Sequence, residues 1–165
     1  MPFDYATNIT AVYNALAQYN TTTAAVDLSA SRTTRVQNVY KNDPGIVGLR
    51  GDIYPAVFVR VNKKKEEFAG LGPTGPSGAR KRATVDYDII GFYRKDGAYG
   101  TQAQVLVELE NLAKNIEGIF QQETSLSGTA MWCQVTDTEF FGPFAQDEVW
   151  IKAVVCHLVA EYMFR

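Results

Sequence analysis

Residues 83–94 (ATVDYDIIGFYR) carry the clearest strand pattern in the sequence. Successive side chains in a strand point to opposite faces of a sheet, and here one face is apolar along its length. The other face is polar at its start and apolar at its end, so we expect one half to meet solvent and the other half a partner. The first face holds Val85, Tyr87, Ile89 and Tyr93, and the second holds Thr84, Asp86, Asp88, Ile90 and Phe92.

Strand and helix patterns on both sides of this segment indicate an α+β protein. The additional strand segments are rich in β-branched and aromatic residues, and the helices show apolar residues at helical spacing. The predicted strands cover residues 33–41, 53–61, 83–94, 129–141 and 147–163, and the predicted helices cover residues 7–19 and 101–122. We expect one domain over residues 1–165, in which a mixed or antiparallel sheet has both helices packed on one face.

Individual residues predict where these elements begin and end. Thr7 or Asn8 is a suitable cap for the first helix, and Pro55 should stand at a strand start or on a sheet edge. Gly142-Pro143 is expected to end the strand over residues 129–141. The last predicted strand is long enough that a helix at its end remains an alternative. The second helix is expected to bury a stripe of Val105, Leu109, Leu112, Ile116 and Ile119, and to expose Glu108, Glu110, Asn111, Lys114 and Asn115.

Residues 62–82 (NKKKEEFAGLGPTGPSGARKR) differ in composition from the rest of the chain. Four glycines, two prolines and six basic residues predict a flexible basic loop at the tip of a long hairpin arm. The glycines do not match a phosphate-binding loop, because prolines interrupt them and a strand follows where a helix would be needed.

Charge is unevenly distributed along the chain. Residues 60–95 have a net charge of +5 and residues 96–165 of −7, although the whole chain has a net charge of −2. A basic middle and an acidic end suit contact between one copy and the next. The candidate protein-interaction residues are Arg60, Lys63, Lys64, Lys65, Arg80, Lys81 and Arg82.

The residues that support most enzyme chemistries are scarce. The chain has 165 residues, one histidine (His157) and two cysteines (Cys133 and Cys156), which we expect to be reduced and buried. His157 is expected to be a hydrogen-bonded core or interface residue. Asp86 and Asp88 lie on one strand face and could hold a metal ion. We nevertheless expect no enzyme activity, cofactor or metal, and neither a secretory signal nor a membrane-spanning segment.

Several of these segments resemble the tail terminator proteins of long-tailed bacteriophages. The similar features are Tyr-Pro-Ala-Val at 54–57, EEF-x-GLG at 66–72 and R-x-x-V-x-Y-x-I-x-G-x-Y at 82–93, followed by the amphipathic helix and two final strands. The resemblance implies a small α+β subunit of a hexameric ring in the virion neck, assembled in the host cytoplasm. Such a ring caps the tail tube protein, joins the tail to the head-completion or connector protein, and lets DNA pass only as cargo.

Three other functions remain open on the sequence. Residues 20–52 form a longer, turn-rich stretch than the family pattern, which leaves another neck, tail-completion or tube-like protein as an alternative. A metal-dependent nuclease would use Asp86 and Asp88. A DNA-binding module would use the basic loop, although the pI near 5.4 argues against it.

Overall fold

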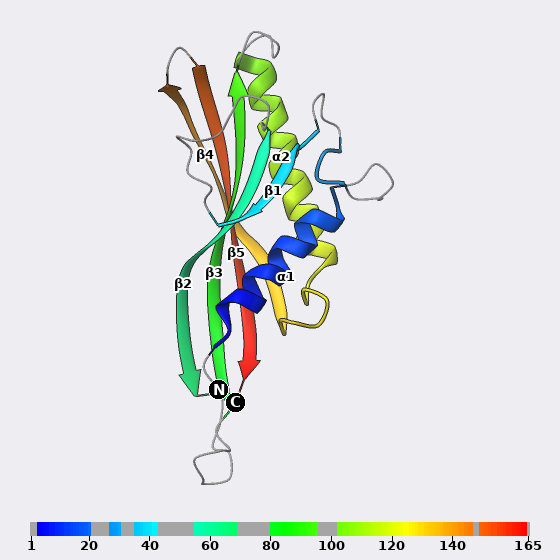
Figure 1. The fold of residues 1–165 in the computed structure, drawn as a ribbon, viewed down its shortest axis with the longest axis vertical. Coiled ribbons are helices and arrows are strands. Elements are labelled where there is room, and N and C mark those ends of the chain that lie inside the picture. Colours follow the sequence, from blue (N-terminus) through cyan, green and yellow to red (C-terminus); the bar gives the residue numbers. More distant parts are fainter. Residues whose placement is uncertain are drawn as a thin grey trace.

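The structure, a computed structural model, describes residues 3–20, 27–30, 35–42, 55–68, 80–95, 102–146 and 149–164. These residues form a sheet of five strands with two helices against one of its faces (Figure 1). The elements are α1 (Tyr5–Gln18), β1 (Asn38–Lys41), β2 (Ala56–Phe68), β3 (Lys81–Lys95), α2 (Gln102–Gln122), β4 (Trp132–Gln146) and β5 (Val149–Phe164).

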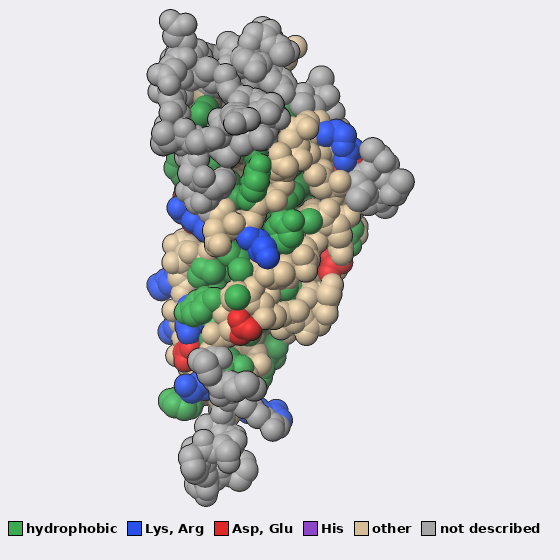
Figure 2. Space-filling model, viewed as in Figure 1, with side chains coloured by type: hydrophobic (Ala, Val, Ile, Leu, Met, Phe, Trp, Pro, Cys, Tyr) green, Lys and Arg blue, Asp and Glu red, His purple; other side chains and the backbone are tan. Residues whose placement is uncertain are grey.

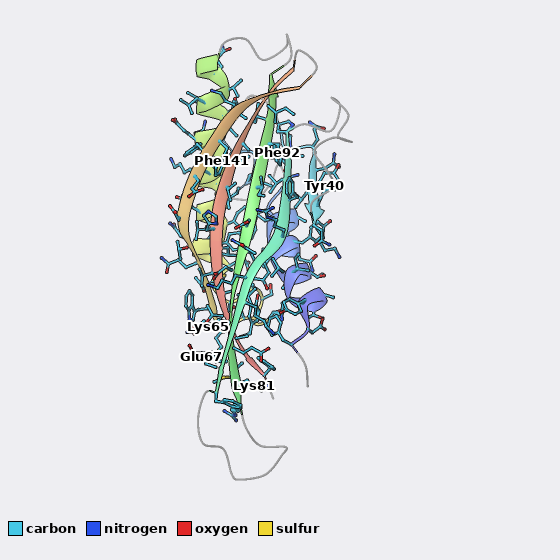
Figure 3. All side chains as sticks on the ribbon, turned by 90° about the vertical axis from the view of Figure 1, so that its left-hand side faces the viewer. Tyr40, Lys65, Glu67, Lys81, Phe92 and Phe141 are labelled. Atoms are coloured by element: carbon cyan, nitrogen blue, oxygen red, sulfur yellow. The ribbon has the colours of Figure 1, made fainter. Side chains whose placement is uncertain are left out.

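The sheet is mixed, and its strand order is β1-β2-β3-β5-β4. β1 runs parallel to β2, whereas the β2–β3, β3–β5 and β4–β5 pairs are antiparallel. Both helices lie behind the sheet when it is viewed from its other side, which we call the open face (Figure 3). The predicted α+β class, the mixed sheet and the placement of both helices on one face are confirmed.

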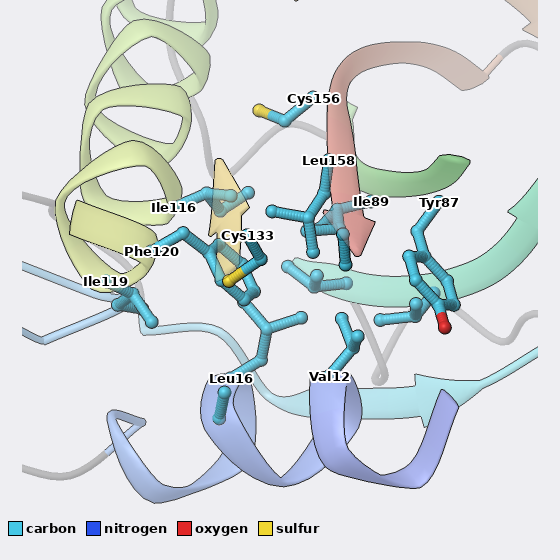
Figure 4. Close-up of a cluster of buried hydrophobic side chains, with 14 of the residues drawn as sticks. Val12, Leu16, Tyr87, Ile89, Ile116, Ile119, Phe120, Cys133, Cys156 and Leu158 are labelled. Carbon is cyan, nitrogen blue, oxygen red and sulfur yellow. The ribbon is translucent and has the colours of Figure 1, made fainter. Parts of the chain in front are cut away.

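The main hydrophobic core fills the space between the helices and the sheet (Figure 4). The predicted apolar face of β3 contributes to this core, and Tyr87 there shares a 2.9 Å hydrogen bond with the hydroxyl of Tyr162. Burying these side chains supplies the main driving force for folding. The five residues of the predicted α2 stripe are all buried: Val105, Leu109, Leu112, Ile116 and Ile119.

A second, smaller apolar cluster lies on the open face. Phe58 and Phe92 stack there with ring centroids 5.0 Å apart, and Ile90 packs beside them. All three side chains are buried within the chain. The apolar half of this β3 face is therefore buried within the chain, which corrects the expectation that it meets a partner.

Several local expectations require correction. Asp4 caps α1 by accepting a 3.1 Å hydrogen bond from the Thr7 amide, so the helix begins at Tyr5 rather than Thr7. Glu108 is buried instead of exposed, because the Tyr93 hydroxyl donates a 2.8 Å hydrogen bond to it. Asn115 is partly buried and donates hydrogen bonds to the Leu28 and Ala30 carbonyls.

β2, β3 and β4 are longer than predicted, whereas β1 covers only Asn38–Lys41 of the strand predicted over residues 33–41. β4 continues through Gly142-Pro143. The pairing of β4 with β5 shifts register between Phe141 and Phe144, and Gly142 adopts a positive φ at this irregularity, so the strand resumes after it. β4 is an edge strand, where a proline's missing N–H is tolerated. β5 is strand over its described length, which excludes the helix alternative at its end. Pro55 directly precedes β2, as predicted.

Part of the predicted flexible loop over residues 62–82 is regular strand. β2 runs to Phe68 and β3 starts at Lys81, and the two are paired from Lys63–Asp86 to Phe68–Lys81. A hairpin arm is therefore present, but residues 62–68 and 81–82 belong to its strands. The Gly/Pro-rich residues 69–79 lie outside the described residues.

Candidate functional site

The predicted basic residues lie on the β2–β3 hairpin and alternate between its two faces. The pairing register places Arg60, Lys63, Lys65 and Arg82 on the open face with Asp88. Lys64 and Lys81 point to the helix side, and Arg80 immediately precedes β3. The candidate interaction residues are therefore divided between the two faces of the hairpin.

Most of these basic side chains are paired inside the hairpin. On the helix side, Lys64 and Lys81 both pair with Glu66. Lys64 also lies over the rings of Phe3 and Tyr5, with Nζ 5.1 and 4.9 Å from their centroids. These contacts neutralise much of the positive charge at this end of the hairpin.

The same arrangement holds on the open face. Glu67 accepts from Lys65 and from Arg82, whose Nη2 lies 3.1 Å from the Oε2 of Glu67 (Figure 3 labels Lys65 and Glu67). Hydrogen bonds from Lys64 and Lys65 lower the pKa of Glu66 and Glu67 respectively, so both carboxylates are charged at neutral pH. These cross-strand pairs explain why a charged segment forms regular strands.

Lys63 and Arg80 differ from the other candidates. Both are exposed, and neither forms an ion pair with any residue in the described part of the chain. They are therefore the two basic residues of the predicted set whose charge is most available to a partner.

A row of polar side chains crosses the open face at the level of Arg60. Arg60 Nε and Nη2 each lie 2.9 Å from Asp88 Oδ2, and Asn62 donates a 3.1 Å hydrogen bond to Asp88 Oδ1. His157 Nδ1 lies 2.9 Å from the same Oδ1, and its Nε2 lies 3.9 Å from Glu139 Oε2. The row thus connects four strands, from β2 to β4.

Asp88 is the centre of this row and is buried, with a side chain only 3% exposed. A buried carboxylate is stable when it is paired and hydrogen-bonded, and here both of its oxygens have partners. Asp86 lies on the same face, as predicted, and is half-buried. A metal ion held by Asp86 and Asp88 would compete with Arg60 and His157 for Asp88, which disfavours the alternative of a metal-dependent nuclease that uses these two carboxylates.

Sequence reasoning missed the approach of Asp137 and Glu139 to His157. The sequence did predict that His157 is hydrogen-bonded, and its partner is Asp88. The two acidic residues lie on a neighbouring strand whose register shifts between Val135 and Asp137, and this shift places Asp137 opposite His157. No local sequence signal marks such a shift, because it depends on pairing between distant segments.

The two thiols are buried, as predicted, and do not form a disulfide. Burial raises the pKa of Cys133 to about 11 and that of Cys156 to about 12, so both are protonated near neutral pH. Cys133 lines a cavity of about 300 Å³ between α2 and β4, together with Glu117 and Gln121. A protonated thiol there is a weak nucleophile.

The sheet has two differently charged edges. β1 covers only residues 56–59 of β2, so from Arg60 onward β2 has no strand partner on that side among the described residues. This basic edge carries four basic and two acidic residues. β4 forms the other edge and carries two acidic residues, Asp137 and Glu139, and no basic one. Figure 2 shows Lys and Arg side chains along the side where Figure 1 places β2.

The comparisons with known proteins give no family assignment. No protein-family model matches the sequence, and no curated protein is significantly similar to it. Within the described residues, no helix is both long and apolar enough to span a membrane.

Proposed function

We propose that this chain is a structural subunit of a bacteriophage tail, the tail terminator. In this proposal, copies form a hexameric ring that caps the tail tube and joins it to the head connector, with DNA passing through as cargo. The ring size and the position in the virion come from the sequence resemblance. The fold and the surface support a subunit that binds further copies of itself.

The observation that carries the proposal is the pair of oppositely charged, unpaired sheet edges. An exposed strand edge offers backbone N–H and C=O groups that can pair with another strand. The basic edge of β2 and the acidic edge of β4 lie on opposite sides of the sheet. A contact between different faces of neighbouring copies is heterologous, and such contacts generate a closed ring when the rotation closes.

Charge complementarity favours this head-to-tail arrangement over contacts between like edges. Two β4 edges would bring Asp137 and Glu139 against their own copies, and like charges placed together are unfavourable. A β2 edge instead brings the positive charge of Lys63 to these two negative carboxylates, which is favourable. The contact would also cover the β4 edge and the part of the β2 edge that β1 leaves unpaired in every copy.

A structural role also fits the chemistry of the described side chains. The two thiols are buried and protonated near neutral pH, and Asp88 is committed to Arg60 and His157. These groups stabilise the fold without offering an activated nucleophile. We therefore propose that the protein is not an enzyme.

The proposal is tested by reversing one charge on each edge and then both together. Lys63→Glu and Asp137→Lys should each weaken assembly, measured by light scattering coupled to size-exclusion chromatography. The double variant should assemble again, because the opposite signs are restored. Thr136→Lys is a matched control, since it adds a lysine to β4 beside Asp137 without removing a carboxylate.

The outcomes discriminate between the arrangements. Rescue in the double variant supports a heterologous contact between these edges. Loss of assembly in both single variants without rescue would place the contact elsewhere. A wild-type chain that stays monomeric at high concentration, both alone and with purified tail tubes, would contradict a self-assembling ring subunit.

A further inference from the structure

Three metal-ligating side chains converge on the open face beside the β4 edge. Asp137 and Glu139 come from β4, and His157 comes from β5. One ligand atom from each lies within 4.8 Å of the others. The two carboxylates are exposed, and the imidazole is 28% exposed, so an ion from solvent can reach them.

Asp88 contacts the Nδ1 side of the His157 imidazole and so fixes the orientation of the ring. Asp88 accepts hydrogen bonds from Arg60 and Asn62, as an ionised carboxylate does, and lies 2.9 Å from His157 Nδ1. A carboxylate in this state can only accept, so Nδ1 must carry a proton and donate it. In a neutral imidazole the lone pair is then on Nε2, the atom 3.9 Å from Glu139 Oε2.

This tautomer leaves three acceptors facing one another. The lone pair of His157 Nε2 meets the carboxylates of Asp137 and Glu139, and none of the three groups offers a donor. A water molecule has two O–H donors and can satisfy two of these acceptors at a time, whereas a divalent metal ion can contact all three.

We propose that Asp137, Glu139 and His157 Nε2 bind a divalent transition-metal ion. One imidazole nitrogen with two carboxylate oxygens is a ligand set that suits Zn²⁺ and its neighbours in the first transition row. The hydrogen bond from a ligand imidazole to a carboxylate is a common outer-shell feature of metal sites, and Asp88 occupies that position. A water molecule would complete the coordination.

The distances require a modest adjustment of two exposed side chains. Bonds of about 2.0–2.2 Å to Zn²⁺ place tetrahedral ligand atoms roughly 3.3 Å apart. The present separations of up to 4.8 Å would have to shorten by about 1–1.5 Å. Asp137 and Glu139 are exposed on an edge strand and can rotate, while the buried partner Asp88 keeps His157 in place.

This inference does not depend on the proposed ring, because one chain supplies all three ligands. The acidic residues also belong to the edge that we propose contacts β2 of the next copy. Binding is therefore measured at concentrations at which the chain is monomeric by size-exclusion chromatography, so that failure of either proposal is seen separately.

The test is a Zn²⁺ titration followed by calorimetry and by ¹⁵N NMR of the single imidazole. We expect one ion per chain, a large shift of the Nε2 resonance and little change at Nδ1. His157→Gln and Glu139→Gln should each weaken Zn²⁺ binding at least tenfold. Asp88→Asn should weaken it by about 10–100-fold, the usual effect of losing an outer-shell carboxylate, with circular dichroism confirming the fold.

Asp86→Asn is the matched control, because Asp86 is a carboxylate on the same face outside the cluster. It should bind Zn²⁺ as the wild type does. An unchanged Nε2 resonance on saturation, or equal affinity in His157→Gln, would overturn the proposal. So would a loss in Asp86→Asn equal to that in Glu139→Gln, since binding would then follow general negative charge.

Discussion

Gly91 is the point at which α2 comes closest to the sheet, and its substitution tests the fold directly. A Cβ atom built at Gly91 would lie 2.4 Å from Leu112 Cδ2 and 3.2 Å from Val154 Cγ1. Ordinary van der Waals contact begins near 3.4 Å, so Leu112 would have to move by about 1 Å. Leu112 is fully buried and cannot move into solvent.

We expect Gly91→Ala to lower the free energy of unfolding by about 2–3 kcal/mol, the upper range for overpacking a core. Urea unfolding at neutral pH, followed by circular dichroism, measures this change. The cause is one identified contact, so the cost should depend on the side chain at position 112. Leu112→Ala alone should cost about 2–5 kcal/mol, because it leaves a cavity.

A double-mutant cycle separates this contact from a general effect of the substitution. In the Leu112→Ala background, Gly91→Ala should cost less than about 1 kcal/mol, because its methyl group then fills vacated space. Gly128→Ala is the control: its strain comes from a φ of +83°, with nothing within 4 Å, and should not couple to position 112. Additive costs for Gly91→Ala and Leu112→Ala would refute this packing of α2 on β3.

Three further predictions concern the buried polar and ionisable groups. Cys133 and Cys156 should react with a thiol reagent at pH 8 far more slowly in the folded protein than after denaturation, where both should be labelled; rapid labelling of the native chain would contradict their burial. The pKa values of the two thiols in the folded protein, about 11 and 12, lie above the value near 9 in the unfolded chain. The unfolded chain therefore loses these protons at a lower pH than the folded protein does, and the urea midpoint should fall as the pH rises from 9 to 11. A constant midpoint would be evidence against the raised pKa values. Arg60→Ala should lower the free energy of unfolding by about 2 kcal/mol, because Asp88 stays buried with one oxygen deprived of its donor, and thermal unfolding unchanged from wild type would show that the pair adds no stability.

The sequence predicted the elements whose patterns are local. The α2 stripe and the apolar face of β3 are set by helical and strand periodicity, and both were found as predicted. Pro55 marks the start of β2 for an equally local reason, its missing N–H. Gly91 appears in the pattern as an ordinary strand residue, and only the docking of Leu112 explains it.

The failures arose where distant segments decide the structure. Residues 62–68 look like a loop by composition, yet Glu66 and Glu67 pair with basic residues of both strands and the segment becomes regular strand. Gly142-Pro143 is absorbed by a bulge on an edge strand rather than ending it. The contact of Asp88 with His157 joins residues 69 positions apart and requires the complete register of β3 on β5.

In the proposed function the gene belongs to a phage genome, so the most direct test is to delete it from that genome and examine the particles by negative-stain electron microscopy. The proposal predicts overlong or ragged tails beside DNA-filled heads without tails. Tails of normal length that fail only to join heads would indicate a neck or tail-completion protein instead. Normal, infectious particles would contradict a structural role in the virion.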